Sequence, residues 1–127
     1  MSGKESVSFK VMLVEDDEGF RRSLAGLLTS RFPSIVIGEA GDGAEAMQKV
    51  KSFSPQLILM DIKLPGQSGL EVTRRIKALY PDIQVVMLTS YDFPEYREAA
   101  RTSGASGFLS KGSSTAEEIQ DLVDGLG

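Results

Sequence analysis

Apolar runs of strand length alternate five times along the chain with segments in which apolar residues recur at helical spacing. The expected strands are residues 9–15, 34–39, 56–61, 83–89 and 106–110. They are nearly continuous in Val, Ile, Leu and Met, which is typical of parallel strands covered by helices on both faces. Because strand-helix-strand crossovers are almost always right-handed, the pattern predicts an α/β domain of five strand-helix units with a doubly wound parallel sheet.

The segments between the strands each carry one apolar stripe, which predicts helices with one buried face. The stripe of the first helix comprises Phe20, Leu24, Leu27 and Leu28, and that of the third comprises Val72, Ile76 and Leu79. The spacing of a capping box, which marks a helix start, occurs at Asp42 with Glu45, Ser68 with Glu71, and Ser114 with Glu117. Prolines precede the second, third and fourth strands, where they separate each strand from the helix before it.

The 127 residues suffice for one domain, which we expect to comprise residues 9–127 after a flexible tail of residues 1–8. The net charge of −4 disfavours direct binding of nucleic acid, so any role connected with DNA is expected to be indirect. No apolar run reaches membrane-spanning length, and the first residues lack the apolar segment of a signal peptide. We therefore expect a cytoplasmic protein without membrane contact.

The sequence contains neither cysteine nor histidine. The first absence excludes disulfides, thiolate metal sites and thiol nucleophiles, and the second excludes histidine zinc sites and catalysis by a histidine general base. The chemistry of this protein must therefore depend on carboxylates, hydroxyls and amines.

Charged and hydroxyl side chains follow the strands at the point where each strand ends, which is where open α/β sheets bind ligands. They are Glu15 and Asp16 after the first strand, Asp61 and Lys63 after the third, Thr89 and Ser90 after the fourth, and Lys111 after the fifth. Three close carboxylates repel one another by roughly 4 kcal/mol per pair at an effective dielectric constant of 20. Lys111 and a Mg²⁺ ion would compensate this repulsion. A phosphoryl group carried by Asp61 would then meet the Thr89 hydroxyl and the Lys111 ammonium.

Each of these residues taken alone has an ordinary structural interpretation. The acidic run that begins at Glu15 suits the start of a helix, where negative charge interacts favourably with the helix dipole. Thr89 alone fits a strand end, and Lys111 alone fits a solvated surface. Asp61 is the exception, because an acid after an apolar strand is costly unless it is paired or functional. The joint occurrence of these residues favours the functional interpretation.

The chain resembles the receiver domain of two-component response regulators from Lys10 to about Leu126. The matching segments are Leu-Val-Glu15-Asp16-Asp-Glu-Gly-Phe-Arg21, Leu-Met-Asp61-Ile-Lys-Leu-Pro65-Gly66-Gln-Ser-Gly69, Leu-Thr89-Ser90 and Gly107-Phe108-Leu-Ser-Lys111. The intervals between them are similar to those of receivers joined to a helix-turn-helix DNA-binding output domain. The resemblance implies a flavodoxin-like sheet with the strand order 2-1-3-4-5.

The resemblance also implies a role for each matched residue. Asp61 would accept a phosphoryl group from a sensor histidine kinase, whose histidine must be external because this chain has none. Glu15, Asp16, Asp61 and the backbone carbonyl of Lys63 would bind Mg²⁺. Thr89 and Lys111 would hold the phosphoryl oxygens, and Phe108 would move inward together with Thr89.

In the family, phosphorylation alters the surface of the fourth helix, fifth strand and fifth helix, here about residues 93–126. The resemblance implies a signalling phosphoacceptor rather than an enzyme, with regulation of transcription as its output and formation of a homodimer on phosphorylation. DNA would be bound only through a separate output domain. The chain departs from many receivers at Gly112, where they have a proline, and Tyr91 lies at a position that tunes the lifetime of the phosphate.

Other functions fit the sequence less well. Gly41-Asp42-Gly43-Ala44-Glu45-Ala46 matches a dinucleotide fingerprint, but it does not follow the first strand, and Asp42 would repel the pyrophosphate. A flavodoxin-like flavin site requires a phosphate loop where this chain has four acids. A phosphatase similar to haloacid dehalogenases requires an acid at the position of Lys63. A receiver that no longer accepts phosphate remains an alternative, although all the required side chains are present.

Overall fold

A computed structural model describes residues 9–90, 93–111 and 116–126 of the chain. Strands and helices alternate in the order β1 (Phe9–Val14), α1 (Glu18–Arg31), β2 (Ile35–Ala40), α2 (Gly43–Phe53), β3 (Leu57–Asp61), α3 (Gly69–Leu79), β4 (Gln84–Thr89), α4 (Pro94–Thr102), β5 (Gly107–Ser110) and α5 (Ala116–Leu126). All five strands are parallel, and their order in the sheet is β2-β1-β3-β4-β5. The predicted fold class and strand order are confirmed. The predicted tail of residues 1–8 lies outside the described residues.

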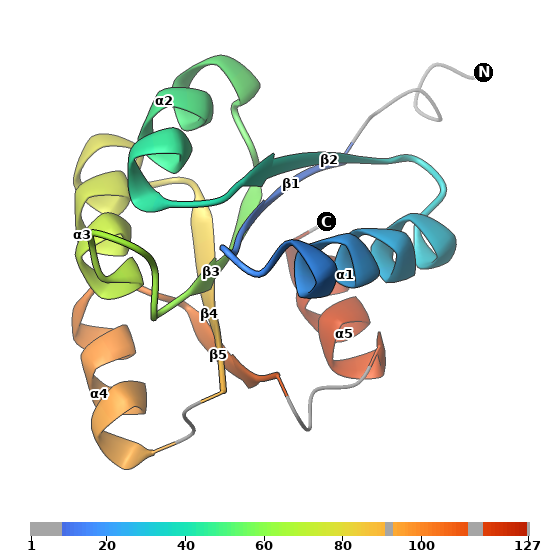
Figure 1. Ribbon diagram of the computed structural model, residues 1–127. Coiled ribbons are helices and arrows are strands. Elements are labelled where there is room, and N and C mark those ends of the chain that lie inside the picture. Colours follow the sequence, from blue (N-terminus) through green and yellow to red (C-terminus); the bar gives the residue numbers. More distant parts are fainter. Residues whose placement is uncertain (1–8, 91–92, 112–115, 127) are drawn as a thin grey trace.

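Helices cover both faces of the sheet, with α2, α3 and α4 on one side and α1 and α5 on the other (Figure 1). Successive residues of each strand therefore contribute to different cores. Met12, Ile58 and Met60 belong to the cluster beneath α2, α3 and α4. Leu13 and Leu59, which alternate with them, belong to the cluster beneath α1 and α5. This burial on both faces explains why the strands are apolar at nearly every position.

Two leucines of the predicted helix stripes lie at the surface, which corrects that part of the prediction. Leu27 is 39% exposed, because it borders a hollow between α1 and α5 rather than the packed core. Leu79 is 61% exposed, since it is the last residue of α3 and borders an open hollow shared with Pro55 and Pro81. Helical periodicity identifies the face that a residue occupies, but it does not show how far the neighbouring elements extend over that face.

The glycine-rich turn before α2 is a helix cap. Asp42 is the N-cap residue, and its Oδ1 accepts a hydrogen bond of 2.8 Å from the Glu45 N–H. The Glu45 carboxylate in turn accepts a bond of 2.8 Å from the Gly41 N–H. A Cβ at Gly43 would lie 2.7 Å from a methyl carbon of Val72, so this glycine permits close packing of α2 against α3. The residues of the dinucleotide fingerprint are thus occupied in capping and packing.

Candidate functional site

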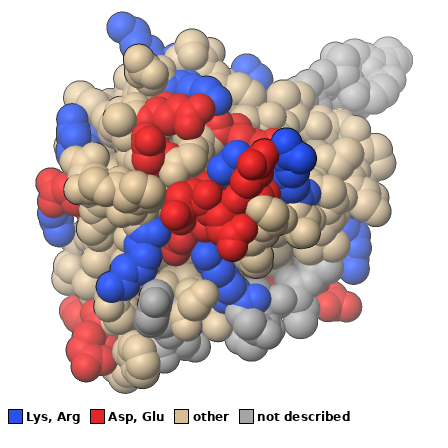
Figure 2. Space-filling view, viewed as in Figure 1, with Lys and Arg blue, Asp and Glu red and all other residues tan. Residues whose placement is uncertain are grey.

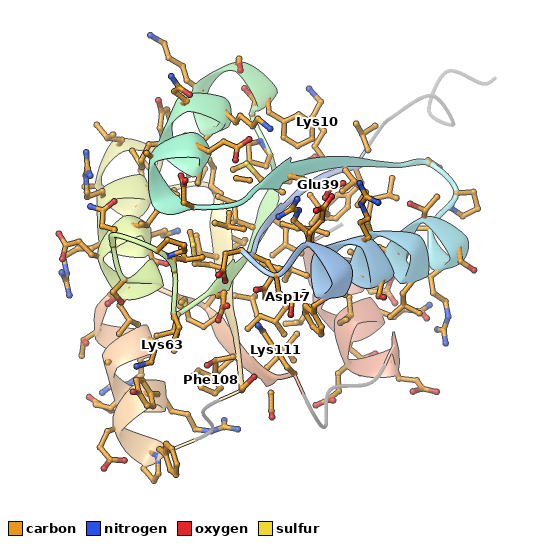
Figure 3. All side chains as sticks on the ribbon, in the orientation of Figure 1. Lys10, Asp17, Glu39, Lys63, Phe108 and Lys111 are labelled. Carbon is orange, nitrogen blue, oxygen red and sulfur yellow. The ribbon has the colours of Figure 1, made fainter. Side chains whose placement is uncertain are left out.

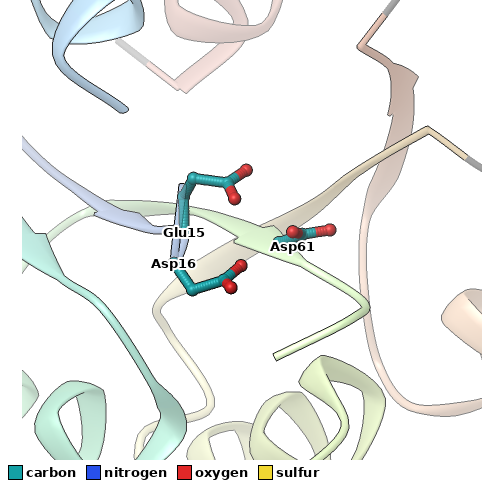
Figure 4. Close-up of side chains that lie close together, drawn as sticks. All are labelled: Glu15, Asp16 and Asp61. Atoms are coloured by element: carbon teal, nitrogen blue, oxygen red, sulfur yellow. The ribbon is translucent and has the colours of Figure 1, made fainter. Parts of the chain in front are cut away.

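Three carboxylates from the ends of two neighbouring strands meet at one point of the carboxyl edge. Glu15 and Asp16 directly follow β1, and Asp61 is the last residue of β3. One oxygen of each lies within 4.8 Å of one oxygen of the others (Figure 4). Glu15 and Asp61 are buried, with 2% and 5% exposed, whereas Asp16 is exposed. The predicted convergence of these acids is present in the structure.

Glu15 is fixed by its backbone and by its side chain. Its N–H continues the ladder between β1 and β2 with a bond of 3.0 Å to the Ala40 carbonyl. Its Oε2 accepts a bond of 3.0 Å from the Asp17 N–H, and its Oε1 forms an ion pair with Lys111. Burial raises the pKa of Glu15 above its ordinary value of 4.5, and the bonds from Lys111 and Asp17 offset only part of this effect.

Lys111 brings a positive charge from the end of β5 into the acidic cluster. Its Nζ lies 3.1 Å from Oδ2 of Asp61 and also contacts Glu15, and only 17% of its side chain is exposed. Its N–H donates a bond of 2.8 Å to the Thr89 carbonyl, which anchors the start of the side chain beside β4. Burial favours the neutral amine, but Glu15 and Asp61 outweigh this effect and raise the pKa of Lys111, so the ammonium is charged.

Asp61 begins a tightly packed loop. Its Oδ1 accepts a long bond of 3.4 Å from the Lys63 N–H. At the start of α3, the Gly69 N–H donates a bond of 2.7 Å to the Ile62 carbonyl. A Cβ at Gly69 would lie only 1.9 Å from the Asp61 carbonyl oxygen, so only glycine fits this position. The loop therefore holds the backbone of Asp61 close to the start of α3.

Thr89 and Phe108 lie on the two strands beyond Asp61. Leu88 pairs with Asp61 in the sheet, so the fully buried Thr89 follows at the carboxyl edge. Phe108 is half-buried, and the Arg97 guanidinium of α4 lies 4.7 Å from the centre of its ring. Figure 3 shows Phe108 and Lys111 near the end of β5, with Lys63 on the side of α4.

Lys63 has an exposed side chain beside the cluster. Its Nζ lies 5.9 Å from the ring centre of Tyr96 in α4, at the border of a hollow of about 310 Å³. Gly112, where the chain departs from many receivers, and Tyr91, at the position that tunes the lifetime of the phosphate, lie outside the described residues.

Two residues at the start of α1 contact the site and were not predicted to do so. The ring centre of Phe20 lies 4.8 Å from Lys111 Nζ. Arg21 donates a bond of 2.6 Å from Nη1 to the Glu15 carbonyl, and its Nε lies 2.7 Å from the Glu39 carboxylate. Phe20 belongs to the apolar stripe of its helix, so the spacing of apolar residues predicted a contact with the core but not one with the Lys111 ammonium. For Arg21, the only signal in the sequence was its position five residues after Asp16, at the end of the first segment that resembles the family.

The oxygen donors of this cluster fit a hard divalent cation. Carboxylates are the ligands that Mg²⁺ prefers in proteins, and the exposed Asp16 leaves the cluster open to solvent. Oε1 of Glu15 is buried and forms no hydrogen bond of good geometry, although it contacts the Lys111 ammonium. Figure 2 shows acidic atoms gathered at the centre of this face with basic side chains around them. An additional positive charge is thus favoured among these carboxylates.

The family model of the response regulator receiver domain matches residues 11–124, nearly the whole chain. The chain belongs to this family. Among solved structures, it is similar to a two-component response regulator of the LuxR family from an Aurantimonas species, with a TM-score of 0.86 and 30% identity over 94% of this chain and 86% of that one. The signal receiver domain of a putative response regulator NarL from Mycobacterium tuberculosis gives a TM-score of 0.84 and 31% identity over 94% and 96% of the two chains.

Curated relatives of this receiver domain include transcriptional regulators. The chain is 34% identical over 113 residues to the response regulator GacA of Pseudomonas syringae, which covers 89% of this chain and 53% of that protein. It is 38% identical over 119 residues to the DNA-binding transcriptional activator DevR/DosR of Mycobacterium tuberculosis, covering 91% and 55%. The chain thus spans about half the length of these relatives. None of the helices in the described segments is long and apolar enough to cross a bilayer.

Proposed function

We propose that this receiver domain accepts a phosphoryl group on Asp61 from the phosphohistidine of a sensor histidine kinase in the cytoplasm. One observation carries this proposal: the buried Asp61 carboxylate lies 3.1 Å from the Lys111 ammonium and within the cluster formed with Glu15 and Asp16. A carboxylate beside fixed cationic charge is suited to receive an anionic group.

In the proposed step, a carboxylate oxygen of Asp61 forms a bond to phosphorus while the nitrogen–phosphorus bond of the donor breaks. The electron pair of that bond returns to the donor imidazole, which takes up a proton from solvent. Lys111 moves from the Asp61 carboxylate to a phosphoryl oxygen, and the Thr89 hydroxyl holds another. Water later attacks phosphorus, which releases inorganic phosphate and regenerates Asp61. The chain is therefore a phosphoacceptor that promotes reactions of its own side chain and turns over no separate organic substrate.

Mg²⁺ would be held by Glu15, Asp16, Asp61 and the backbone carbonyl of Lys63. When bound, it would screen the charge of the incoming phosphoryl group from the carboxylates. Asp16 is the exposed member of the cluster, so it is the carboxylate that an arriving ion meets first.

The proposed output is a change of the surface formed by α4, β5 and α5. As Thr89 turns toward the phosphoryl group, Phe108 moves inward, and its contact with Arg97 on α4 is lost. This change would alter partner preference and favour a homodimer. Relatives named as transcriptional activators support transcription as the output, and DNA would be bound through a separate output domain.

The proposal is tested by intact-mass spectrometry after incubation with acetyl phosphate and Mg²⁺. We expect the wild type to gain the mass of one phosphoryl group and Asp61→Asn to gain none. Asp82→Asn serves as the control, because Asp82 is an exposed acid in the loop before β4. An unmodified wild type, or an equally modified Asp61→Asn variant, would contradict the proposal. Transfer from a purified kinase labelled on histidine then tests the donor.

A further inference from the structure

The Lys111 ammonium lies between carboxylates and an aromatic ring. Glu15 and Asp61 pair with Nζ on one side. The ring centre of Phe20 lies 4.8 Å from the same atom. This distance is within the range of a cation–π interaction, in which the electron-rich face of the ring attracts the cation.

Phe20 is held in this position by the first turn of α1. Its N–H donates a bond of 3.1 Å to Oδ1 of Asp17, the N-cap residue of the helix. Its half-buried ring packs against the cluster beneath α1 and α5. The ring also borders a hollow of about 160 Å³, together with Leu24, Leu88 and Lys111. Phe20 is thus anchored to the helix start on one side and to the core on the other.

A lysine side chain is a flexible four-carbon stem, so contacts to its ammonium are needed to keep it in one conformation. When Asp61 becomes phosphorylated, its carboxylate becomes an acyl phosphate, so Lys111 loses the charged Oδ2 with which it now pairs. The carboxylate contacts of the ammonium therefore change during the reaction, whereas the reaction leaves the Phe20 ring beside it chemically unaltered.

We propose that Phe20 is a positioning residue for phosphoryl transfer, whose ring face holds the Lys111 ammonium toward the Asp61 carboxylate. This inference rests on the proposed function of Asp61. Its proposed role is to act through the lysine, whose ammonium it contacts, rather than through a contact with the phosphoryl group. Both side chains of this contact belong to the receiver domain itself. Its effect on phosphoryl transfer can therefore be measured with a small phosphodonor, in the absence of a kinase.

The kinetic test uses phosphoramidate as donor and follows phosphorylation by intact mass. Phe20→Leu removes the ring, and we expect transfer about fivefold slower, since a partly buried cation–π contact contributes on the order of 1 kcal/mol. Phe20→Tyr keeps the ring face and should restore most of the rate. Phe32→Leu is the matched control: Phe32 packs against the same cluster at the opposite end of α1. It should leave the rate unchanged.

A spectroscopic test detects the contact without any transfer. The ε-methylene protons of Lys111, assigned by their loss in Lys111→Arg, should be shifted upfield by the ring current of Phe20. The shift should disappear in Phe20→Leu, persist in Phe20→Tyr and remain in Phe32→Leu. Because this signal does not require phosphorylation, it separates an error about Phe20 from an error about Asp61.

Three results would overturn the inference. One is an unshifted Lys111 signal in the wild type, the second is an unchanged rate in Phe20→Leu, and the third is equal slowing by Leu and Tyr, which would assign the defect to packing. If Phe20→Leu does not fold, Phe20→Met, which conserves volume, takes its place in the same comparison. Loss of the ring shift together with slower transfer and rescue by Tyr supports the inference.

Discussion

The ammonium of Lys111 lies 3.1 Å from Oδ2 of Asp61, although the two residues come from β5 and β3, which are separated in the sheet by β4. The lysine side chain spans the width of one strand to reach the carboxylate. Glu15, at the end of β1, which lies beyond β3 in the sheet, pairs with the same ammonium. One cation thus connects two carboxylates that would otherwise repel each other in a buried setting.

Removing Lys111 should leave two buried carboxylates without their partner. We expect Lys111→Ala to lower the free energy of unfolding by about 3 kcal/mol in the absence of divalent ions. Added Mg²⁺ should recover part of this loss, because it supplies a replacement cation. Urea unfolding with and without Mg²⁺ measures both effects. Lys49→Ala, which breaks an exposed pair with Glu45, should cost less than about 1 kcal/mol and show no Mg²⁺ rescue. Equal responses of the two variants would contradict the prediction.

Asp16 should be needed for Mg²⁺ binding but not for the fold. Asp16→Ala removes one of three mutually repelling carboxylates, so the free energy of unfolding should stay the same or rise without metal. Its affinity for Mg²⁺, measured by titration calorimetry, should fall at least about tenfold, as expected for loss of a direct ligand. Glu18→Ala makes the same charge change at an exposed residue paired with Arg22 and should retain the affinity. Wild-type affinity in Asp16→Ala would refute the assignment.

Gly69 and Gly26 should respond in opposite directions to alanine. A Cβ at Gly69 would collide with the Asp61 carbonyl oxygen, so Gly69→Ala should destabilise the fold by about 2 kcal/mol or more and displace Asp61. A Cβ at Gly26, inside α1, meets nothing within 4 Å. Gly26→Ala should therefore stabilise the protein by about 0.5 to 1 kcal/mol through helix propensity. Thermal unfolding distinguishes the two, and a stable Gly69→Ala variant would disprove the close contact.

Glu45 should contribute a pH-dependent part of the stability. The hydrogen bond from the Gly41 N–H, together with Lys49, lowers the pKa of Glu45 below its ordinary value of 4.5. The charged form therefore stabilises the fold at pH values above 4.5, and this contribution is lost as the pH falls through the lower folded pKa. We expect Glu45→Gln to cost about 0.5 kcal/mol near neutral pH, since the side chain is partly exposed, and progressively less in acid. A pH-independent cost in urea unfolding would contradict this origin.

The sequence by itself determined the sheet, its layers and the edge at which the polar residues meet. Strand runs such as Leu57–Asp61 are apolar at nearly every position because both faces of the sheet are buried, and this property is local enough to be read along the chain. Parallel strands then place their carboxyl ends at one edge. The convergence of Asp61 with Glu15, Asp16 and Lys111 follows from that rule and from the family pattern.

Only the tertiary structure decided which side chains touch. Phe20, Leu27 and Leu79 all belong to predicted apolar stripes, yet one caps the Lys111 ammonium and the other two are exposed. Helical periodicity specifies the direction in which a side chain points around the helix axis. Whether that side chain makes a contact depends on how close the neighbouring element lies and how far it extends. The same limit applies to Arg21, whose bond to the Glu15 carbonyl requires α1 to start at a fixed point beside β1. Pairings between distant segments arise from packing, which no local pattern encodes.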